Sequence, residues 1–86
     1  MSGITIYTKK HCSYCVQAKV LLQSKEYLFH EISLEAHPEL LLEVMERSGQ
    51  RTVPQIFVGN QSVGGFTELF QKISNGEFDA LIQPST

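Results

Sequence analysis

Two cysteines separated by two residues, Cys12-Ser13-Tyr14-Cys15, stand between a strand-like segment and a helix-like one. An apolar, strand-like run covers residues 4–8, and a helix-like run covers residues 16–23. The first turn of a helix presents unpaired N–H groups and the positive end of the helix dipole, which stabilise negative charge. We therefore expect Cys12 to lose its proton more readily than a free thiol, and Cys15, one helical turn later, to close a disulfide with it. The motif predicts a redox switch at a strand-to-helix junction.

The composition is that of one small globular domain, residues 1–86. Hydrophobic residues make up 42% of the chain, and no apolar run approaches the roughly 18 residues that a membrane-spanning helix needs. No basic segment followed by an apolar stretch marks a secretory signal, so we expect a cytoplasmic protein with no membrane partner. The net charge is −2 and the seven basic residues are scattered, which argues against nucleic acid as a partner.

The spacing of the two cysteines favours chemistry over structural stabilisation. A disulfide stabilises a fold more when it closes a longer loop, and this one would close a very short loop. We expect no zinc site, because His11, His30 and His37 are not at zinc spacing and no second cysteine pair follows. His11 is either an exposed loop residue or an aid to the Cys12 thiolate.

Apolar periodicity and turn residues divide the chain into four strands and three helices. The strands are expected at 3–8, 28–34, 53–58 and 61–63, and the helices at 13–25, 37–48 and 67–74. Within the second strand the apolar residues change phase, which suggests that the strand ends or bulges near Glu31. Pro38 suits the first turn of the second helix, Gly49 suits its end, and Asn75-Gly76 suits the end of the third.

The resulting order, β-α-β-α-β-β-α, predicts an α/β domain. A helix between the first two strands implies a parallel pair with a right-handed crossover, while the tight turn Gly59-Asn60 implies an antiparallel hairpin. These connections predict a four-stranded mixed sheet flanked by three helices. Cys12 and Cys15 then lie at the carboxyl end of the first strand, where open α/β sheets usually place their sites.

Three stretches together resemble the glutaredoxin family, over essentially the whole chain. They are Tyr7-Thr8-Lys9 with the Cys12-Ser13-Tyr14-Cys15 motif, Thr52-Val53-Pro54-Gln55-Ile56-Phe57, and Gly64-Gly65 followed by Phe66-Thr67-Glu68. The resemblance implies a thioredoxin-like fold and a glutathione-dependent thiol–disulfide oxidoreductase. It also implies that protein disulfides and glutathione mixed disulfides are the substrates, with Cys12 as nucleophile and Cys15 as resolving cysteine. A thioredoxin proper is disfavoured, because the chain contains no tryptophan.

By this resemblance, one side of a glutathione site is an extended loop. Thr52, Val53 and Pro54 would form a cis-proline loop that faces the dithiol, with the Val53 backbone free to pair with glutathione and the Thr52 hydroxyl supporting the loop. Tyr14 would cover the reactive sulfur and line the groove. Plain packing is the alternative for this side chain.

The charged ends of glutathione would be bound at two other places. Lys9 and Arg51 would take the glycyl carboxylate, unless they are simply solvated charges. The N–H groups that begin the third helix would take the γ-glutamyl carboxylate, and Glu68 would pair with the γ-glutamyl amine, although Glu68 also suits a helix's first turn on its own. The residues that begin this helix are Gly65, Phe66 and Thr67, and Phe66 is as readily core filling.

Glutathione is thus the expected co-substrate of a monomer that requires no metal. The expected partners are disulfide-bearing or glutathionylated proteins and, indirectly, glutathione reductase. Ser13 stands where glutaredoxins most often carry proline, and some serine-bearing relatives bind a [2Fe–2S] cluster between two monomers. An iron–sulfur carrier that uses Cys12 and glutathione as ligands is therefore the alternative, while a resolving Cys15 favours the enzyme.

Overall fold

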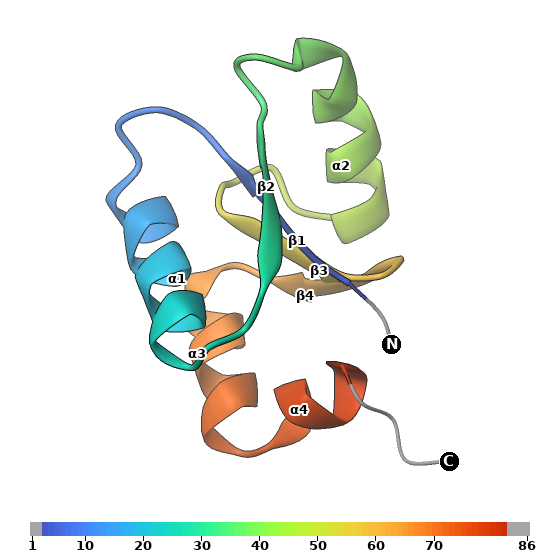
Figure 1. The fold of residues 1–86 in the computed structure, drawn as a ribbon. Coiled ribbons are helices and arrows are strands. Elements are labelled where there is room, and N and C mark those ends of the chain that lie inside the picture. Colours follow the sequence, from blue (N-terminus) through green and yellow to red (C-terminus); the bar gives the residue numbers. More distant parts are fainter. Residues whose placement is uncertain (1–2, 83–86) are drawn as a thin grey trace.

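The computed structural model describes residues 3–82, which form one mixed sheet and the helices around it (Figure 1). In chain order the elements are β1 (Ile4–Thr8), α1 (Ser13–Ser24), β2 (Phe29–Ser33), a 3-10 turn η1 (Pro38–Leu40), α2 (Leu41–Ser48), β3 (Gln55–Val58), β4 (Gln61–Gly64), α3 (Phe66–Ser74) and α4 (Glu77–Ile82). The strand order is β2-β1-β3-β4. β1 is parallel to β2 and antiparallel to β3, and β3 forms an antiparallel hairpin with β4. The predicted four-stranded mixed α/β sheet is confirmed.

β1 is an inner strand of the sheet and buries side chains on both of its faces. Ile4 and Ile6 pack on one face against α1, α3 and α4, while Tyr7 packs on the other face against α2. Figure 1 shows the same division, with α1 and α3 on one side of the sheet and α2 on the other. The first cluster consists of Ile4, Ile6, Ala18, Leu22, Ile56, Val58, Val63, Leu69 and Phe78, and the second of Tyr7, Leu34, Val44 and Phe57. This two-sided burial holds the carboxyl end of β1, and with it the loop to Cys12, in place.

β2 continues through Glu31 to Ser33, so the end or bulge expected near Glu31 is wrong. Every residue of β2 pairs in register with β1. The apolar residues change phase for another reason: Phe29 packs against the first cluster and Ile32 against the second. A strand covered on both faces needs no strict alternation of apolar and polar residues.

The helix ends follow local signals. Cys12 is the N-cap of α1, Pro38 begins η1, and Gly49 ends α2 in the left-handed conformation, with φ of 72°. Glycine adopts that conformation without a steric penalty, which is why it marks so many helix ends. None of the helices within residues 3–82 has the length and apolar character to cross a membrane.

The three helices expected from the sequence omit α4. Asn75 ends α3, but its Oδ1 also accepts a hydrogen bond from the Glu77 N–H at 2.9 Å and so begins the next helix. α4 buries Phe78 in the first cluster, with its ring 5.1 Å from that of Tyr27. The Tyr27 hydroxyl donates a hydrogen bond to Asp79, and burial together with this carboxylate raises the pKa of Tyr27 to about 12. These contacts attach α4 to the end of the molecule opposite the dithiol loop (Figure 1).

Candidate functional site

The candidate site lies where β1 ends and α1 begins. Cys12 and Cys15 form a disulfide, with their Cα atoms 5.2 Å apart. Cys12 Sγ accepts a hydrogen bond from the Cys15 N–H at 3.1 Å. This donor is one of the otherwise unpaired N–H groups of the first turn of α1, so it also suits a negative charge on Cys12. Cys12 is half-buried whereas Cys15 is only 2% exposed, so Cys12 is the sulfur that an incoming thiolate reaches.

The loop before β3 faces Cys12. The Val53 carbonyl oxygen lies 3.8 Å from Cys12 Sγ, and the Val53–Pro54 peptide bond is cis, as the resemblance implies. Gln55 is buried, and its Nε2 donates a hydrogen bond to the Thr52 carbonyl oxygen at 2.6 Å. In the structure this loop is therefore supported by the side chain of Gln55, the first residue of β3. The family resemblance implies the Thr52 hydroxyl for that role.

A groove of about 320 Å³ opens beside the dithiol, between the start of α1, the cis-proline loop and the start of α3. Tyr14 is 58% exposed, and its ring lies 5.9 Å from that of Phe66. The lining residues are Tyr14, Gln50, Thr52, Val53, Pro54, Gly65, Phe66, Thr67 and Glu68. The structure thus brings together all the predicted glutathione-site residues except Lys9 and Arg51. Gln50, which the resemblance implies near those two basic residues, also lines the groove.

The start of α3 is closed by its own glutamate. Glu68 Oε1 accepts a hydrogen bond from the Gly65 N–H at 2.8 Å. Gly64, with φ of +116°, lies against the same side chain, and a Cβ at this position would be 2.7 Å from Glu68 Oε1. The resemblance implies that the Gly65 N–H donates a hydrogen bond to the γ-glutamyl carboxylate of glutathione. In this structure the same N–H donates to Glu68 instead.

Lys9 and Arg51 lie outside the groove. Lys9 is exposed on the loop between β1 and α1 and lines a neighbouring cavity with Cys12. Arg51 is exposed between Gln50 and Thr52, which both line the groove.

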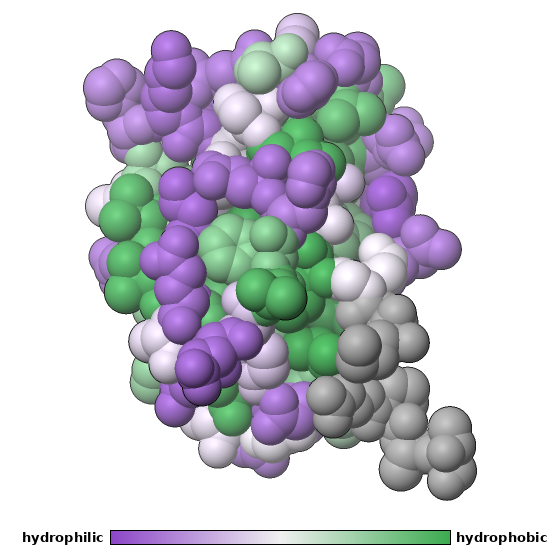
Figure 2. All heavy atoms as spheres, in the orientation of Figure 1, coloured by the Kyte–Doolittle hydropathy of each residue, from purple (hydrophilic) through white to green (hydrophobic). Residues whose placement is uncertain are grey.

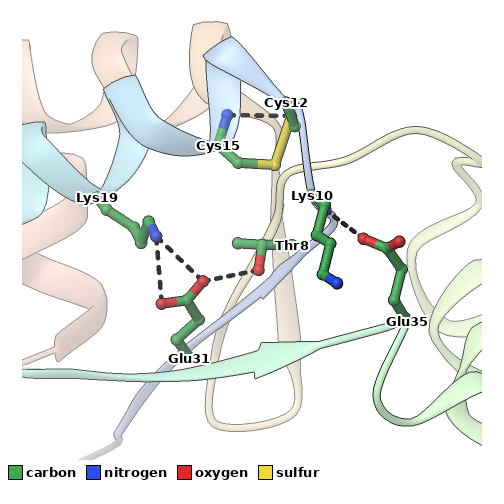
Figure 3. Close-up of polar contacts among 7 residues, drawn as sticks. All are labelled: Thr8, Lys10, Cys12, Cys15, Lys19, Glu31 and Glu35. Atoms are coloured by element: carbon green, nitrogen blue, oxygen red, sulfur yellow. Dashed lines mark hydrogen bonds and ion pairs between the residues drawn. A yellow bond between two sulfur atoms is a disulfide. The ribbon is translucent and has the colours of Figure 1, made fainter.

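A second cavity, of about 730 Å³, also borders the dithiol and shares none of the lining residues of the groove. Both cysteines line it, together with Thr8, Lys19 and Glu31 (Figure 3). The Thr8 hydroxyl donates a hydrogen bond to Glu31 Oε2 at 2.8 Å, and Lys19 Nζ donates to Oε1 and Oε2 at 3.3 and 3.1 Å. The hydrogen bond from Thr8, helped by Lys19, outweighs the effect of burial and lowers the pKa of Glu31 below its ordinary value.

Sequence reasoning missed these three polar residues of the second cavity. Lys19 did carry a signal, because it follows Cys15 by four residues and such residues share a helix face. Glu31 and Thr8 carried none, because their contact joins residues 23 positions apart and depends on the register of β1 with β2.

A polar contact holds the loop beside the second cavity. The Lys10 N–H donates a hydrogen bond to the Glu35 carboxylate, which connects the β1–α1 loop to the segment after β2 (Figure 3). Figure 2 shows hydrophilic side chains over this loop on the face in view, whereas hydrophilic and hydrophobic side chains are mixed over α2. Within residues 3–82 no group of three or more His, Cys, Asp or Glu side chains is placed to hold a metal ion.

Comparisons with known proteins agree with this geometry. The glutaredoxin family model matches residues 4–63, more than half of the chain. A glutaredoxin of Neisseria meningitidis serogroup A is 44% identical over 85 residues, which are 98% of this chain and 100% of the relative. Glutaredoxin 3 of Escherichia coli K12 is 40% identical over 83 residues, which are 96% of this chain and 100% of the relative.

Solved structures share the fold. The solution structure of a glutaredoxin from Brucella melitensis has a TM-score of 0.81 and 45% identity, and the match covers 95% of this chain and 89% of that one. The crystal structure of a buckwheat glutaredoxin–glutathione complex has a TM-score of 0.85 over 95% of this chain and 77% of that one, but at 24% identity it shows the fold alone. The family model, the full-length relatives and the disulfide at the head of α1 agree: this chain has a thioredoxin-like fold and belongs to the glutaredoxin family of thiol–disulfide oxidoreductases.

Proposed function

We propose that this protein is a glutathione-dependent oxidoreductase that reduces glutathione mixed disulfides and protein disulfides through Cys12 and Cys15. One observation carries the proposal: the more exposed sulfur, Cys12, has a peptide-sized groove beside it and a buried partner sulfur behind it. The groove has an aromatic wall from Tyr14 and Phe66 and a backbone edge at Val53. Its volume falls at the lower end of small-molecule sites, as suits a tripeptide.

The first route needs only Cys12. The Cys12 thiolate attacks the glutathionyl sulfur of a mixed disulfide, the protein thiolate leaves, and glutathione remains joined to Cys12. A second glutathione thiolate attacks that glutathionyl sulfur, oxidised glutathione leaves, and Cys12 returns as a thiolate. The sulfur of the second glutathione is oxidised, the protein sulfur is reduced to a thiol, and the two glutathionyl sulfurs end in one disulfide.

The second route uses both cysteines and serves protein disulfides. Cys12 attacks the substrate disulfide and forms a mixed disulfide, and Cys15 then attacks Cys12 Sγ, which releases the reduced substrate and closes the Cys12–Cys15 disulfide. Two glutathione molecules reduce that disulfide in turn. Glutaredoxin potentials of roughly −200 to −230 mV lie close to that of the glutathione pool, so the reaction can run in either direction.

The groove suggests how glutathione lies. The Val53 backbone would pair with the extended peptide, Tyr14 would cover its sulfur, and Lys9 and Arg51 would approach its glycyl carboxylate from outside the groove. The N–H groups that begin α3 would attract the γ-glutamyl carboxylate, with Glu68 shared between capping the helix and pairing with the amine. The buckwheat protein, which shares the fold, was solved as a glutathione complex. The proposed setting is a monomer in the cytoplasm, where thiols are kept reduced.

An iron–sulfur carrier would use the same Cys12 sulfur as a ligand. A [2Fe–2S] cluster needs that sulfur as a free thiolate, whereas in the observed disulfide it is bonded to Cys15. Because Cys15 lies within disulfide distance of Cys12, it can act as a resolving cysteine, and this supports the enzyme.

The test is glutathione-dependent reduction of a small glutathione mixed disulfide, coupled to NADPH through glutathione reductase. We expect Cys12→Ser to be inactive and Cys15→Ser to keep turning over, because the first route needs one sulfur only. A parent protein without activity in this assay would refute the proposal, and a brown colour with charge-transfer absorption after anaerobic purification would then favour the carrier.

A further inference from the structure

The second cavity is lined both by an ion pair and by Cys15, the cysteine that the first route leaves unused. Cys15 and Lys19 both line this cavity, and four residues separate them on α1, so they share one helix face. Lys19 Nζ lies 3.1 Å from Glu31 Oε2, and Thr8 holds the same oxygen from the buried end of β1. Figure 3 shows the Lys19 side chain running from α1 to Glu31, with Thr8 on the side toward the disulfide.

The chemistry of the second route places negative charge on Cys15. A glutathione thiolate that attacks the disulfide forms a bond to Cys12 Sγ, the Cys12–Cys15 bond breaks, and its electron pair stays on Cys15 Sγ. In the reverse step Cys15 must attack as a thiolate. Cys15 is only 2% exposed, so water stabilises that charge poorly and a fixed charge nearby has a large influence.

We propose that Lys19 stabilises the negative charge on Cys15 during disulfide exchange and that Glu31, as the counter-ion of Lys19, offsets part of that stabilisation. This inference rests on the proposed function and concerns its two-cysteine route alone. Lys9, Lys10 and His11 also line the cavity, but they are exposed and belong to the loop before α1. Lys19 instead projects from the helix that carries Cys15 and is held by both carboxylate oxygens of Glu31.

Removing one partner of the Lys19–Glu31 pair leaves the charge of the other partner unpaired. The two single variants therefore leave charges of opposite sign, which makes them a diagnostic test. Lys19→Met leaves the Glu31 carboxylate, which repels a developing thiolate, while Glu31→Gln leaves an uncompensated ammonium, which attracts it. A purely structural role would make both variants change the rate in the same direction. Lys19→Arg keeps the charge and should restore the parent rate.

The experiment measures single-turnover reduction of the Cys12–Cys15 disulfide by glutathione, and closure of the disulfide from the Cys12–glutathione mixed disulfide. We expect Lys19→Met to slow both steps by about threefold to tenfold and Glu31→Gln to accelerate both by about twofold to fivefold. The matched controls are Lys72→Met and Glu77→Gln, which break an ion pair of the same 3.1 Å separation and similar lysine exposure at the join of α3 and α4.

Three outcomes would overturn the inference. The first is that Lys19→Met and Glu31→Gln shift the exchange rates in the same direction. The second is an effect no larger than that of the Lys72 and Glu77 controls. The third is an equal effect of Lys19→Met on the mixed-disulfide activity of the Cys15→Ser protein. Each of these leaves the proposed function intact. If glutathione does not reduce the parent disulfide at all, the proposed function fails instead.

Discussion

Both cysteines line the second cavity, whereas the groove approaches the disulfide only through Tyr14 and Val53, and the two spaces offer different groups beside the reactive sulfurs. The groove offers aromatic rings and backbone, from Tyr14, Phe66 and Val53. The second cavity offers an ammonium and a carboxylate, from Lys19 and Glu31. Rings and backbone recognise an extended ligand, whereas fixed charges act on the electron pair of a breaking bond. The difference teaches that recognition and charge control occupy separate residues here, so substitutions can alter one without the other.

The largest effect on the groove should come from Gly64→Ala. Its φ of +116° disfavours any side chain, and the new Cβ would lie 2.7 Å from Glu68 Oε1. We expect the Michaelis constant for a glutathione mixed disulfide to rise at least about tenfold and the free energy of unfolding to fall by about 1–3 kcal/mol. Steady-state kinetics and urea unfolding would measure the two effects.

Gly76→Ala is the matched control for that experiment. Gly76 also has a positive φ, +85°, but its Cβ would meet no atom within 4 Å. It should lose stability and keep its Michaelis constant. An equal rise in the Michaelis constant for both variants would show that backbone strain, and not the shape of the groove, is what the assay detects.

Tyr14→Ala should have the next largest effect, because it removes the aromatic wall beside Phe66. An aromatic contact contributes about 0.5–1.5 kcal/mol, so we expect kcat/KM for the mixed disulfide to fall about threefold to tenfold. Phe70→Ala is the control, since Phe70 lies 6.2 Å from Phe66, is exposed, and does not line the groove. A Phe70 effect as large as that of Tyr14 would contradict the assignment of the groove.

Lys9→Met and Arg51→Met should each raise the Michaelis constant by about twofold to fivefold, because exposed charges interact weakly through solvent. These effects should shrink as the salt concentration rises from about 0.02 M to about 0.5 M, while the Tyr14 effect should not. Kinetics at both salt concentrations would separate charge from contact. If the rise in the Michaelis constant of Arg51→Met did not depend on salt, the Arg51 side chain would have to enter the groove.

The smallest effect should be the contribution of Glu31 to the pH dependence of the free energy of unfolding. Its folded-state pKa lies below the ordinary value of 4.5, so its contribution is present above about pH 4.5 and is lost as the pH falls through the folded value. Because the Glu31 side chain is 39% exposed, we expect about 0.5 kcal/mol or less. Urea unfolding at neutral and acidic pH would show a smaller loss in Glu31→Gln than in the parent. An unchanged pH dependence would mean that Thr8 and Lys19 do not hold the carboxylate in solution.

The sequence by itself predicts the features that short-range signals encode. The Cys12–Cys15 spacing at the end of an apolar run, the helix end at Gly49 and the tight turn at Gly59-Asn60 all act within a few residues, and the structure confirms the elements that they delimit. Their order then restricts the chain to a mixed four-stranded sheet. The cis-proline loop came from family resemblance, because spacing alone does not distinguish a cis from a trans peptide bond.

The tertiary structure alone decided what depends on long-range packing. Glu31 meets Lys19 and Thr8 only because β2 pairs with β1 in one register and α1 crosses over that edge. α4 is six residues long, too short for a periodic signal, and is held by the burial of Phe78. Lys9 and Arg51, expected to act together, lie outside the groove because the paths of two separate loops set their positions. Local patterns determine which elements form, whereas side chains from distant segments become neighbours only when the sheet and its helices are assembled.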